Sequence, residues 1–208
     1  MVLSVEDIRP IRFGDVAFEG GRWPMYLHVV EHPDGLVLVD TGMLVSHPEI
    51  VDFDPEFTPL DSLVDPSSVA LVINTHLHFD HCGGNPLFSG RPIHVQRIEL
   101  ADARSEEDYT IPEWIDFPGA TYEELDGDAE LADGVRVITT PGHTRGHQSV
   151  VVDTDAGPVV IGGDVSYQYR DLNDPKTEGQ RRVRELEPVA VWLAHKDEPW
   201  RPGAAARP

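Results

Sequence analysis

The sequence has little cysteine and no long uninterrupted hydrophobic run, and each shortage excludes a class of protein. Its one cysteine, Cys82, cannot form an internal disulfide, which argues against a disulfide-stapled extracellular domain. No apolar run approaches the roughly 18 residues that a membrane-spanning helix needs. Glu6, Asp7 and Arg9 stand where a signal peptide would need an apolar stretch. We therefore expect a soluble, cytoplasmic protein without a membrane partner.

Positive charge is also scarce. Lys and Arg number 16 against 37 Asp and Glu, which gives a net charge of −21. There is no Lys or Arg between Trp23 and Gly90, and none among the residues from Glu106 to Asp133, which hold eleven acids. Such a surface repels phosphate backbones, so nucleic acid is not expected as a partner. Acidic runs are usually solvated faces, and the alternative here is a negative field around a strongly positive metal site.

The length and the hydrophobic pattern indicate a globular domain with β-strands. We expect one domain over residues 1–200 of the 208 and a flexible tail at 201–208. Short runs rich in Val and Ile alternate with turn signals, as strands do. A tight hairpin is predicted at 32–35, where Asp-Gly supplies the positive φ that the turn needs. The predicted strands are 26–31, 35–40, 69–74, 93–96, 135–139, 149–154, 158–162 and 189–193.

Helical periodicity is clearest in two segments. The first is 96–105, in which several apolar side chains recur near a common face. The second is 175–187, where Asn173 or Asp174 can cap the helix. Strands mixed with a few helices imply layered α/β structure. The apolar residues expected on the shared face of the first helix are Ile98, Leu100 and Ala101.

The chemistry is concentrated in the segment 75–85, which directly follows the apolar run 69–73. Four of its residues can bind a metal ion: His76, His78, Asp80 and His81. In an extended chain His76 and His78 project to the same side, and a turn at Phe79 brings the other two round beside them. Two neighbouring cation sites could thus share one loop. A surface histidine cluster or a purification tag is the alternative, but tags are homopolymeric and do not follow a buried strand.

Further candidate ligands stand at the ends of later predicted strands. His143 follows a Pro-Gly turn, Asp164 follows a Gly-Gly pair, and His195 ends the last apolar run. Each alone would more often be an ordinary core or turn residue. Together they match the way a rigid sheet scaffold fixes a site. Imidazole and carboxylate ligands suit Zn²⁺, but also Fe, Co or Mn.

These motifs resemble the metallo-β-lactamase superfamily, and within it the N-acyl homoserine lactonases, which are quorum-quenching enzymes. The resemblance implies an α/β fold in the form of a four-layer αββα sandwich, with a dinuclear metal site at one edge. It covers nearly the whole chain. The matching stretches are 40–43, 75–85, 92–97, 141–149 and 164–167.

Carried over position by position, the resemblance assigns a role to each candidate ligand. The first metal takes His76, His78 and His143, the second takes Asp80, His81 and His195, and Asp164 bridges the two. Asp80 and Tyr167 are assigned to catalysis, and Phe79 and Tyr167 to substrate binding.

The remaining His and Cys residues receive lesser roles. Cys82 is expected to be a small buried thiol that points away from the ligands, and His147 is expected to support a ligand. The histidines without a motif context are His28, His32, His47 and His94.

The function that the resemblance implies is metal-dependent hydrolysis of lactone rings, with N-acyl homoserine lactones as candidate small-molecule substrates. A hydroxide shared by two divalent ions, most simply Zn²⁺, would attack the ring carbonyl. Three alternatives stay open: hydrolysis of another ester or a thioester, as in glyoxalase II; an iron oxidoreductase of the persulfide dioxygenase type; and a metal-stabilised binding module. The segment 44–68 is shorter than in those lactonases, so we expect a shallower acyl pocket and leave the oligomeric state open.

Overall fold

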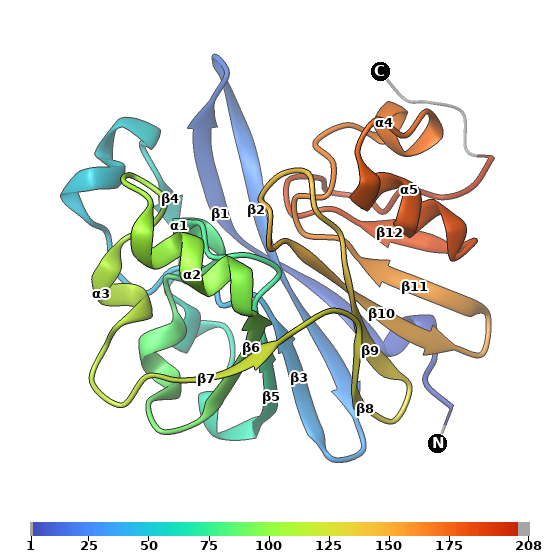
Figure 1. The fold of residues 1–208 in the computed structure, drawn as a ribbon, viewed down its shortest axis with the longest axis horizontal. Coiled ribbons are helices and arrows are strands. Elements are labelled where there is room, and N and C mark those ends of the chain that lie inside the picture. Colours follow the sequence, from blue (N-terminus) through green and yellow to red (C-terminus); the bar gives the residue numbers. More distant parts are fainter. Residues whose placement is uncertain (1, 204–208) are drawn as a thin grey trace.

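The computed structural model describes residues 2–203 and places two β-sheets face to face (Figure 1). The seven-stranded sheet has the order β4-β1-β2-β3-β5-β6-β7, and the five-stranded sheet has the order β12-β11-β10-β9-β8. The strands are β1 Ile8–Phe18, β2 Gly21–His32, β3 Gly35–Val39, β4 Glu56–Phe57, β5 Val69–Ile73, β6 Pro92–Gln96, β7 Thr121–Leu125, β8 Ala129–Ala132, β9 Val135–Thr139, β10 Gln148–Thr154, β11 Gly157–Ile161 and β12 Ala190–Trp192. The predicted tail at 201–208 lies outside the described residues from position 204 onward.

Alternating aliphatic side chains create the interface between the two sheets. Along β10, Val150 and Val152 point into the core between the sheets, whereas Val151 packs on the opposite face. In β3, Val37 and Val39 take the same inward position. Successive strand residues face opposite sides of a sheet, so each of these strands is apolar on both faces and needs a covering layer on each.

Helices form the two outer layers. They are α1 Phe79–Cys82, α2 Arg97–Ser105, α3 Pro112–Ile115, α4 Tyr169–Asn173 and α5 Glu178–Glu185, with the 3₁₀ turns η1 Val5–Asp7, η2 Pro48–Phe53, η3 Leu60–Ser62, η4 Pro66–Ser68 and η5 Asn85–Phe88. Leu172 and Val183 of α4 and α5 cover the five-stranded sheet, while α2, α3 and several 3₁₀ turns cover the other (Figure 1). The predicted four-layer αββα sandwich is confirmed. No helix within residues 2–203 has the length and apolarity to span a membrane.

All eight predicted strands are present, with ends shifted by one residue at most, apart from β2, which extends five residues further toward the N-terminus. The hairpin between β2 and β3 is also confirmed, because His32 pairs with Gly35 and Gly35 has φ +117°. Four strands were not predicted: β1, β4, β7 and β8.

Two details of the helix predictions are wrong. Asn173 ends α4 and does not cap the next helix; Thr177 caps α5, its side chain accepting the N–H of Gln180. On α2, Ile98 and Ala101 are exposed, and the buried face contains Glu99 and Asp102 beside Leu100 and Ala103. The rule that apolar side chains mark the buried face fails here because the two acids have polar partners inside the fold.

Gly84 offers a test of how tightly the loop after β5 packs on the end of β3. A Cβ added at Gly84 would lie 2.3 Å from the carbonyl oxygen of Thr41, which is immobile backbone. We expect Gly84→Ala to lower the free energy of unfolding by about 1–3 kcal/mol, a typical cost of overpacking. Thermal denaturation measures it. Gly21→Ala is the matched control, since its Cβ would meet nothing closer than 3.7 Å; equal losses in the two variants would contradict the close contact.

Candidate metal centre

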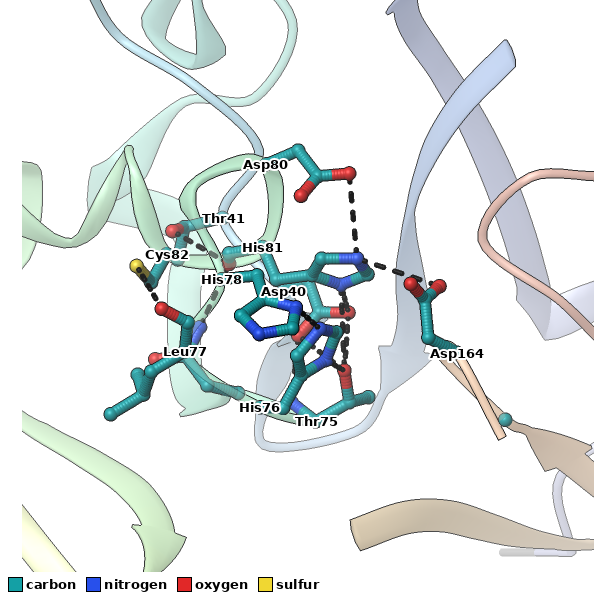
Figure 2. Close-up of polar contacts among 12 residues, drawn as sticks. Asp40, Thr41, Thr75, His76, Leu77, His78, Asp80, His81, Cys82 and Asp164 are labelled. Carbon is teal, nitrogen blue, oxygen red and sulfur yellow. Dashed lines mark hydrogen bonds and ion pairs between the residues drawn. The ribbon is translucent and has the colours of Figure 1, made fainter. Parts of the chain in front are cut away.

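The loop after β5 presents the four ligand candidates of segment 75–85 at one edge of the sandwich. Residues 74–78 lie outside regular secondary structure, and α1 begins at Phe79, so the chain turns at the predicted position. This turn brings Asp80 and His81 beside the two preceding histidines, as Figure 2 shows. Asp80 and His81 are buried, as is His76. The local geometry expected for this motif is therefore present.

Three histidines direct their ring nitrogens at one point. Nε2 of His76 lies 3.1 Å from Nδ1 of His78, and Nε2 of His143 lies 3.2 and 2.9 Å from these two atoms. His143 comes from the turn between β9 and β10, on the other sheet. Three convergent imidazoles can hold one cation.

Asp80, His81 and His195 form a second group beside the first. Oδ2 of Asp80 lies 3.6 Å from Nε2 of His81 and 3.5 Å from Nε2 of His195. His195 follows β12, and its Nδ1–H donates to the carbonyl oxygen of Pro24 at 2.8 Å, which aims Nε2 into the group. These three residues could hold another cation.

Asp164 lies between the two groups. Its Oδ1 is 3.6 Å from Nε2 of His81 and 3.4 Å from Nε2 of His195, and its Oδ2 is 3.5 Å from Nε2 of His143. Figure 2 shows the His81 ring between the carboxylates of Asp80 and Asp164. All seven predicted ligands therefore gather in one cluster, with one carboxylate in reach of both halves.

The residues of this cluster fit divalent cations. Nε2 of His81 and Oδ1 of Asp164 are buried atoms without a hydrogen-bond partner, although buried polar atoms are normally paired. Burial lowers the pKa of His78 to about 4, which leaves its ring neutral with a lone pair free to bind metal. Burial acts the same way on His81, but Asp80, Asp40 and Asp164 outweigh it and raise its pKa to about 10. A bound cation would neutralise the same carboxylates that raise the pKa of His81.

Asp40 is a residue of this site to which the sequence analysis gave no role. It follows β3 with φ +61°, and its Oδ2 accepts Nδ1–H of His81 at 2.8 Å. The same carboxylate accepts the backbone N–H and the hydroxyl of Thr75, which in turn contacts Nδ1 of His76 at 3.1 Å. A carboxylate on the far nitrogen fixes the tautomer and orientation of a histidine ligand. The sequence feature that could have identified Asp40 is its position directly after the apolar run 36–39.

His147 supports Asp164 through the backbone. The N–H of Asp164 donates to Nε2 of His147 at 3.2 Å, so Nδ1 of that ring carries the proton and donates to Thr140 Oγ1 at 2.8 Å. Burial lowers the pKa of His147 to about 3, which keeps the ring neutral and able to accept.

The lone cysteine takes no part in the cluster. Cys82 is fully buried, and its thiol donates to the carbonyl oxygen of Leu77 at 3.3 Å, away from the ligands (Figure 2). Burial raises its pKa to about 12. Of the histidines without a motif, His28 is also buried, beside Trp192, with an unpaired Nε2. Neither Cys82 nor His28 lines the cavity that opens onto the cluster.

A cavity of about 530 Å³ opens onto the cluster. Phe79, Tyr167 and Trp23 line it, and the rings of Trp23 and Tyr167 meet edge to face with centroids 5.3 Å apart. The hydroxyl of Tyr167 lies 3.2 Å from Nδ1 of His143. Apolar side chains that the sequence analysis did not identify complete the wall: Val16, Phe18, Ile50, Phe53 and Ile111.

The position of Asp164 generates a test of the cluster. We expect the purified protein to hold about two divalent ions per chain, as sites of this kind do. Asp164→Ala should lower metal content and activity more than folding, because its carboxylate offsets repulsion between cations while the packing of β11 does not need it. Metal analysis and thermal denaturation measure the two effects, with the exposed Asp155→Ala as control. Full metal content and full turnover in Asp164→Ala would mean that Asp164 does not join the two groups.

Comparison with protein families and curated proteins identifies relatives of this chain. Residues 21–204 match the Lactamase_B family, described as the metallo-beta-lactamase superfamily. The chain is 37% identical over 170 residues to an N-acyl homoserine lactonase of Bacillus sp, a match that covers 73% of this chain and 67% of that protein. It is 35% identical, with the same coverage, to the N-acyl homoserine lactonase AiiA of Bacillus thuringiensis subsp. kurstaki.

Solved structures of lactonases are also similar to this chain. A quorum-quenching N-acyl homoserine lactone lactonase superposes with a TM-score of 0.79 at 28% identity, over 94% of each chain. An N-acyl homoserine lactone hydrolase with the product N-hexanoyl-L-homoserine bound at its catalytic metal centre gives a TM-score of 0.77 at 26% identity, again over 94% of each chain. The fold, the cluster of His and Asp side chains and these matches together show that the chain belongs to the metallo-beta-lactamase superfamily.

Proposed function

We propose that this protein is a metal-dependent hydrolase that opens the ring of lactones, with N-acyl homoserine lactones as its substrate class. The observation that carries the proposal is a largely apolar cavity whose floor is the His and Asp cluster, including His78, Asp80 and Asp164. An apolar wall accepts an acyl chain, and the cluster meets the polar ring. The relatives at 35–37% identity are N-acyl homoserine lactonases.

The proposal includes two divalent ions, most simply Zn²⁺. His76, His78 and His143 would hold one ion, Asp80, His81 and His195 the other, and Asp164 would contact both. Bound ions of this kind supply a hydroxide nucleophile at neutral pH and polarise a carbonyl oxygen. Imidazole and carboxylate groups also bind Fe, Co or Mn. Elemental analysis of the purified protein identifies which metal it holds.

The residues of this chain orient the substrate and handle the proton. Burial, with Asp164 and Asp80 nearby, raises the pKa of Tyr167, so its hydroxyl keeps its proton and can donate to the ring carbonyl as negative charge develops. The ring oxygen needs a proton when it leaves. Asp80 lines the cavity, and in this proposal it is the group that would transfer that proton. Phe79 packs against Phe53, with ring centroids 5.1 Å apart, and would contact the lactone ring from the wall.

A substrate panel tests the proposal directly. The purified, metal-loaded protein is given an N-acyl homoserine lactone, a thioester and a persulfide, and ring opening, thiol release and oxygen uptake are followed separately. We expect turnover of the lactone with release of one proton per ring opened. Thiol release without lactone opening would assign the site to thioester hydrolysis, and oxygen uptake would assign it to an iron oxidoreductase.

The hydroxyl of Tyr167 provides a sharper test. Tyr167→Phe keeps the ring and its packing against Trp23 but removes the donor. Loss of one oxyanion donor can cost about 10²–10³ in kcat, but the metals share the charge here, so we expect about tenfold, or about 1.4 kcal/mol of barrier. KM should change less than kcat.

The matched control for this variant is Tyr122→Phe. Its hydroxyl donates to the carbonyl oxygen of Ile115 at 3.0 Å, and Tyr122 does not line the cavity. This control should lower stability and leave kcat unchanged. Undiminished lactone turnover in a fully metallated Tyr167→Phe protein would remove Tyr167 from the catalytic residues.

The apolar wall of the cavity gives a further prediction. Although the segment 44–68 is short, its 3₁₀ turn η2 still places Ile50 and Phe53 in the cavity wall. An apolar wall discriminates by about 1–3 kcal/mol per methylene, so Phe53→Ala should flatten the dependence of kcat/KM on acyl length. Val51→Ala, on the same turn but 65% exposed and outside the wall, is the control. Identical profiles for the wild type and Phe53→Ala, from butanoyl to decanoyl lactones, would place the acyl chain elsewhere.

A further inference from the structure

Glu99, on the buried face of α2, is a charged side chain that the proposed chemistry does not use. It is 0% exposed, and within residues 2–203 no Lys or Arg forms an ion pair with it. Its carboxylate instead accepts three hydrogen bonds. They come from the backbone N–H of Leu77 at 2.8 Å, the hydroxyl of Tyr109 at 2.5 Å and the hydroxyl of Thr144 at 2.6 Å. Burial raises the pKa of Glu99, and these three donors oppose the rise.

The three donors belong to three different segments around the His76, His78 and His143 group. Leu77 stands between the first two of these histidines, so its N–H fixes the backbone that carries both. Thr144 directly follows the third. Tyr109 lines the cavity, and its ring centroid lies 5.1 Å from that of His78. One carboxylate therefore connects three chain segments on this side of the cluster.

Close packing holds the loop that carries His143 against the same helix. A Cβ added at Gly146 would lie 2.3 Å from the backbone nitrogen of Glu99, so the loop backbone approaches α2 as only glycine permits. One turn further along α2, Asp102 pairs with Arg145 at 2.6 Å. The first turns of α2 thus form a rigid base for the loop, and Glu99 is the part of that base that also reaches the loop after β5.

We propose that Glu99 is a positioning residue for the His76, His78 and His143 group. By holding Leu77 and Thr144 at fixed places, it sets the distance between the imidazoles on the β5 loop and the imidazole on the β9–β10 turn. Asp40 orients His81 in the other half of the cluster, so each half has its own buried carboxylate. This inference rests on the proposed metal-dependent hydrolysis, but its test requires only that the protein binds metal.

The experiment titrates Co²⁺ into the metal-free protein and follows its visible absorption, which reports the geometry of the ligands. Glu99→Gln keeps the shape of the side chain but removes its charge and leaves one oxygen acceptor where there were two. Loss of such a supporting carboxylate typically costs 10–100-fold in metal affinity, and we expect about tenfold for one Co²⁺ equivalent, with a changed spectrum at saturation. On the loaded enzyme, kcat should fall while KM stays nearly constant.

Asp102→Asn is the matched control. Asp102 is a buried acid on the same helix whose partner is Arg145, and it contacts neither Leu77 nor Tyr109. It should leave Co²⁺ affinity within about threefold of the wild type, well short of the loss expected from a ligand-supporting group. Wild-type affinity and spectrum in a folded Glu99→Gln protein, with only a lower melting temperature, would overturn the proposal.

A second pair of variants keeps the proposal testable if Glu99→Gln does not fold. Tyr109→Phe and Thr144→Val each remove one donor and leave Glu99 in place. Each should weaken Co²⁺ binding by a smaller factor than Glu99→Gln, and unchanged affinity in both would overturn the proposal. If the Co²⁺ results hold while the wild type opens no lactone, the proposed substrate is wrong and the role of Glu99 stands.

Discussion

The convergence of seven His and Asp side chains at one edge of the sandwich, where they could hold metal ions, is the constraint on which the rest of the structure depends. Ring nitrogens of three histidines lie 2.9–3.2 Å apart, and the oxygens of Asp164 lie 3.4–3.6 Å from three histidines. Bringing so many acceptors out of water is costly unless cations neutralise them. The scaffold must therefore be rigid enough to keep them together. Two sheets whose strand ends meet at this edge, tied by a continuous aliphatic core, provide that rigidity.

The sheets alone do not orient the side chains, and buried polar groups do so. Asp40 fixes His81 and Thr75, His147 fixes the backbone of Asp164, and the carbonyl of Pro24 fixes His195. Each contact joins elements distant in sequence, so the orientation of the ligands is a property of the complete fold. The polar side chains that orient the ligand candidates, Asp40, Thr75 and His147, are accordingly buried like the aliphatic core.

The candidate ligands could be identified from the sequence because they stand in local strings that follow aliphatic strands. β1 escaped prediction because it contains Pro10, Gly14 and charged residues, with a bulge between Arg12 and Gly14. β7 is an acidic edge strand with little apolar signal. The inward face of α2 could not be found from periodicity, since its acids are buried by partners about 10 to 45 residues away in the chain.

The cavity also bears on which substrates suit this site. Its walls come largely from the two stretches of the chain that lack Lys and Arg, and the residues that line it include neither type. Outside the cluster, the charged groups at the cavity are the carboxylates Glu49 and Asp108. A thioester of an anionic carrier would place its own carboxylates beside these groups with no cation in the wall to receive them. A neutral lactone with an apolar tail meets no such repulsion, so the charge pattern that is conspicuous in the sequence favours lactones over charged thioesters.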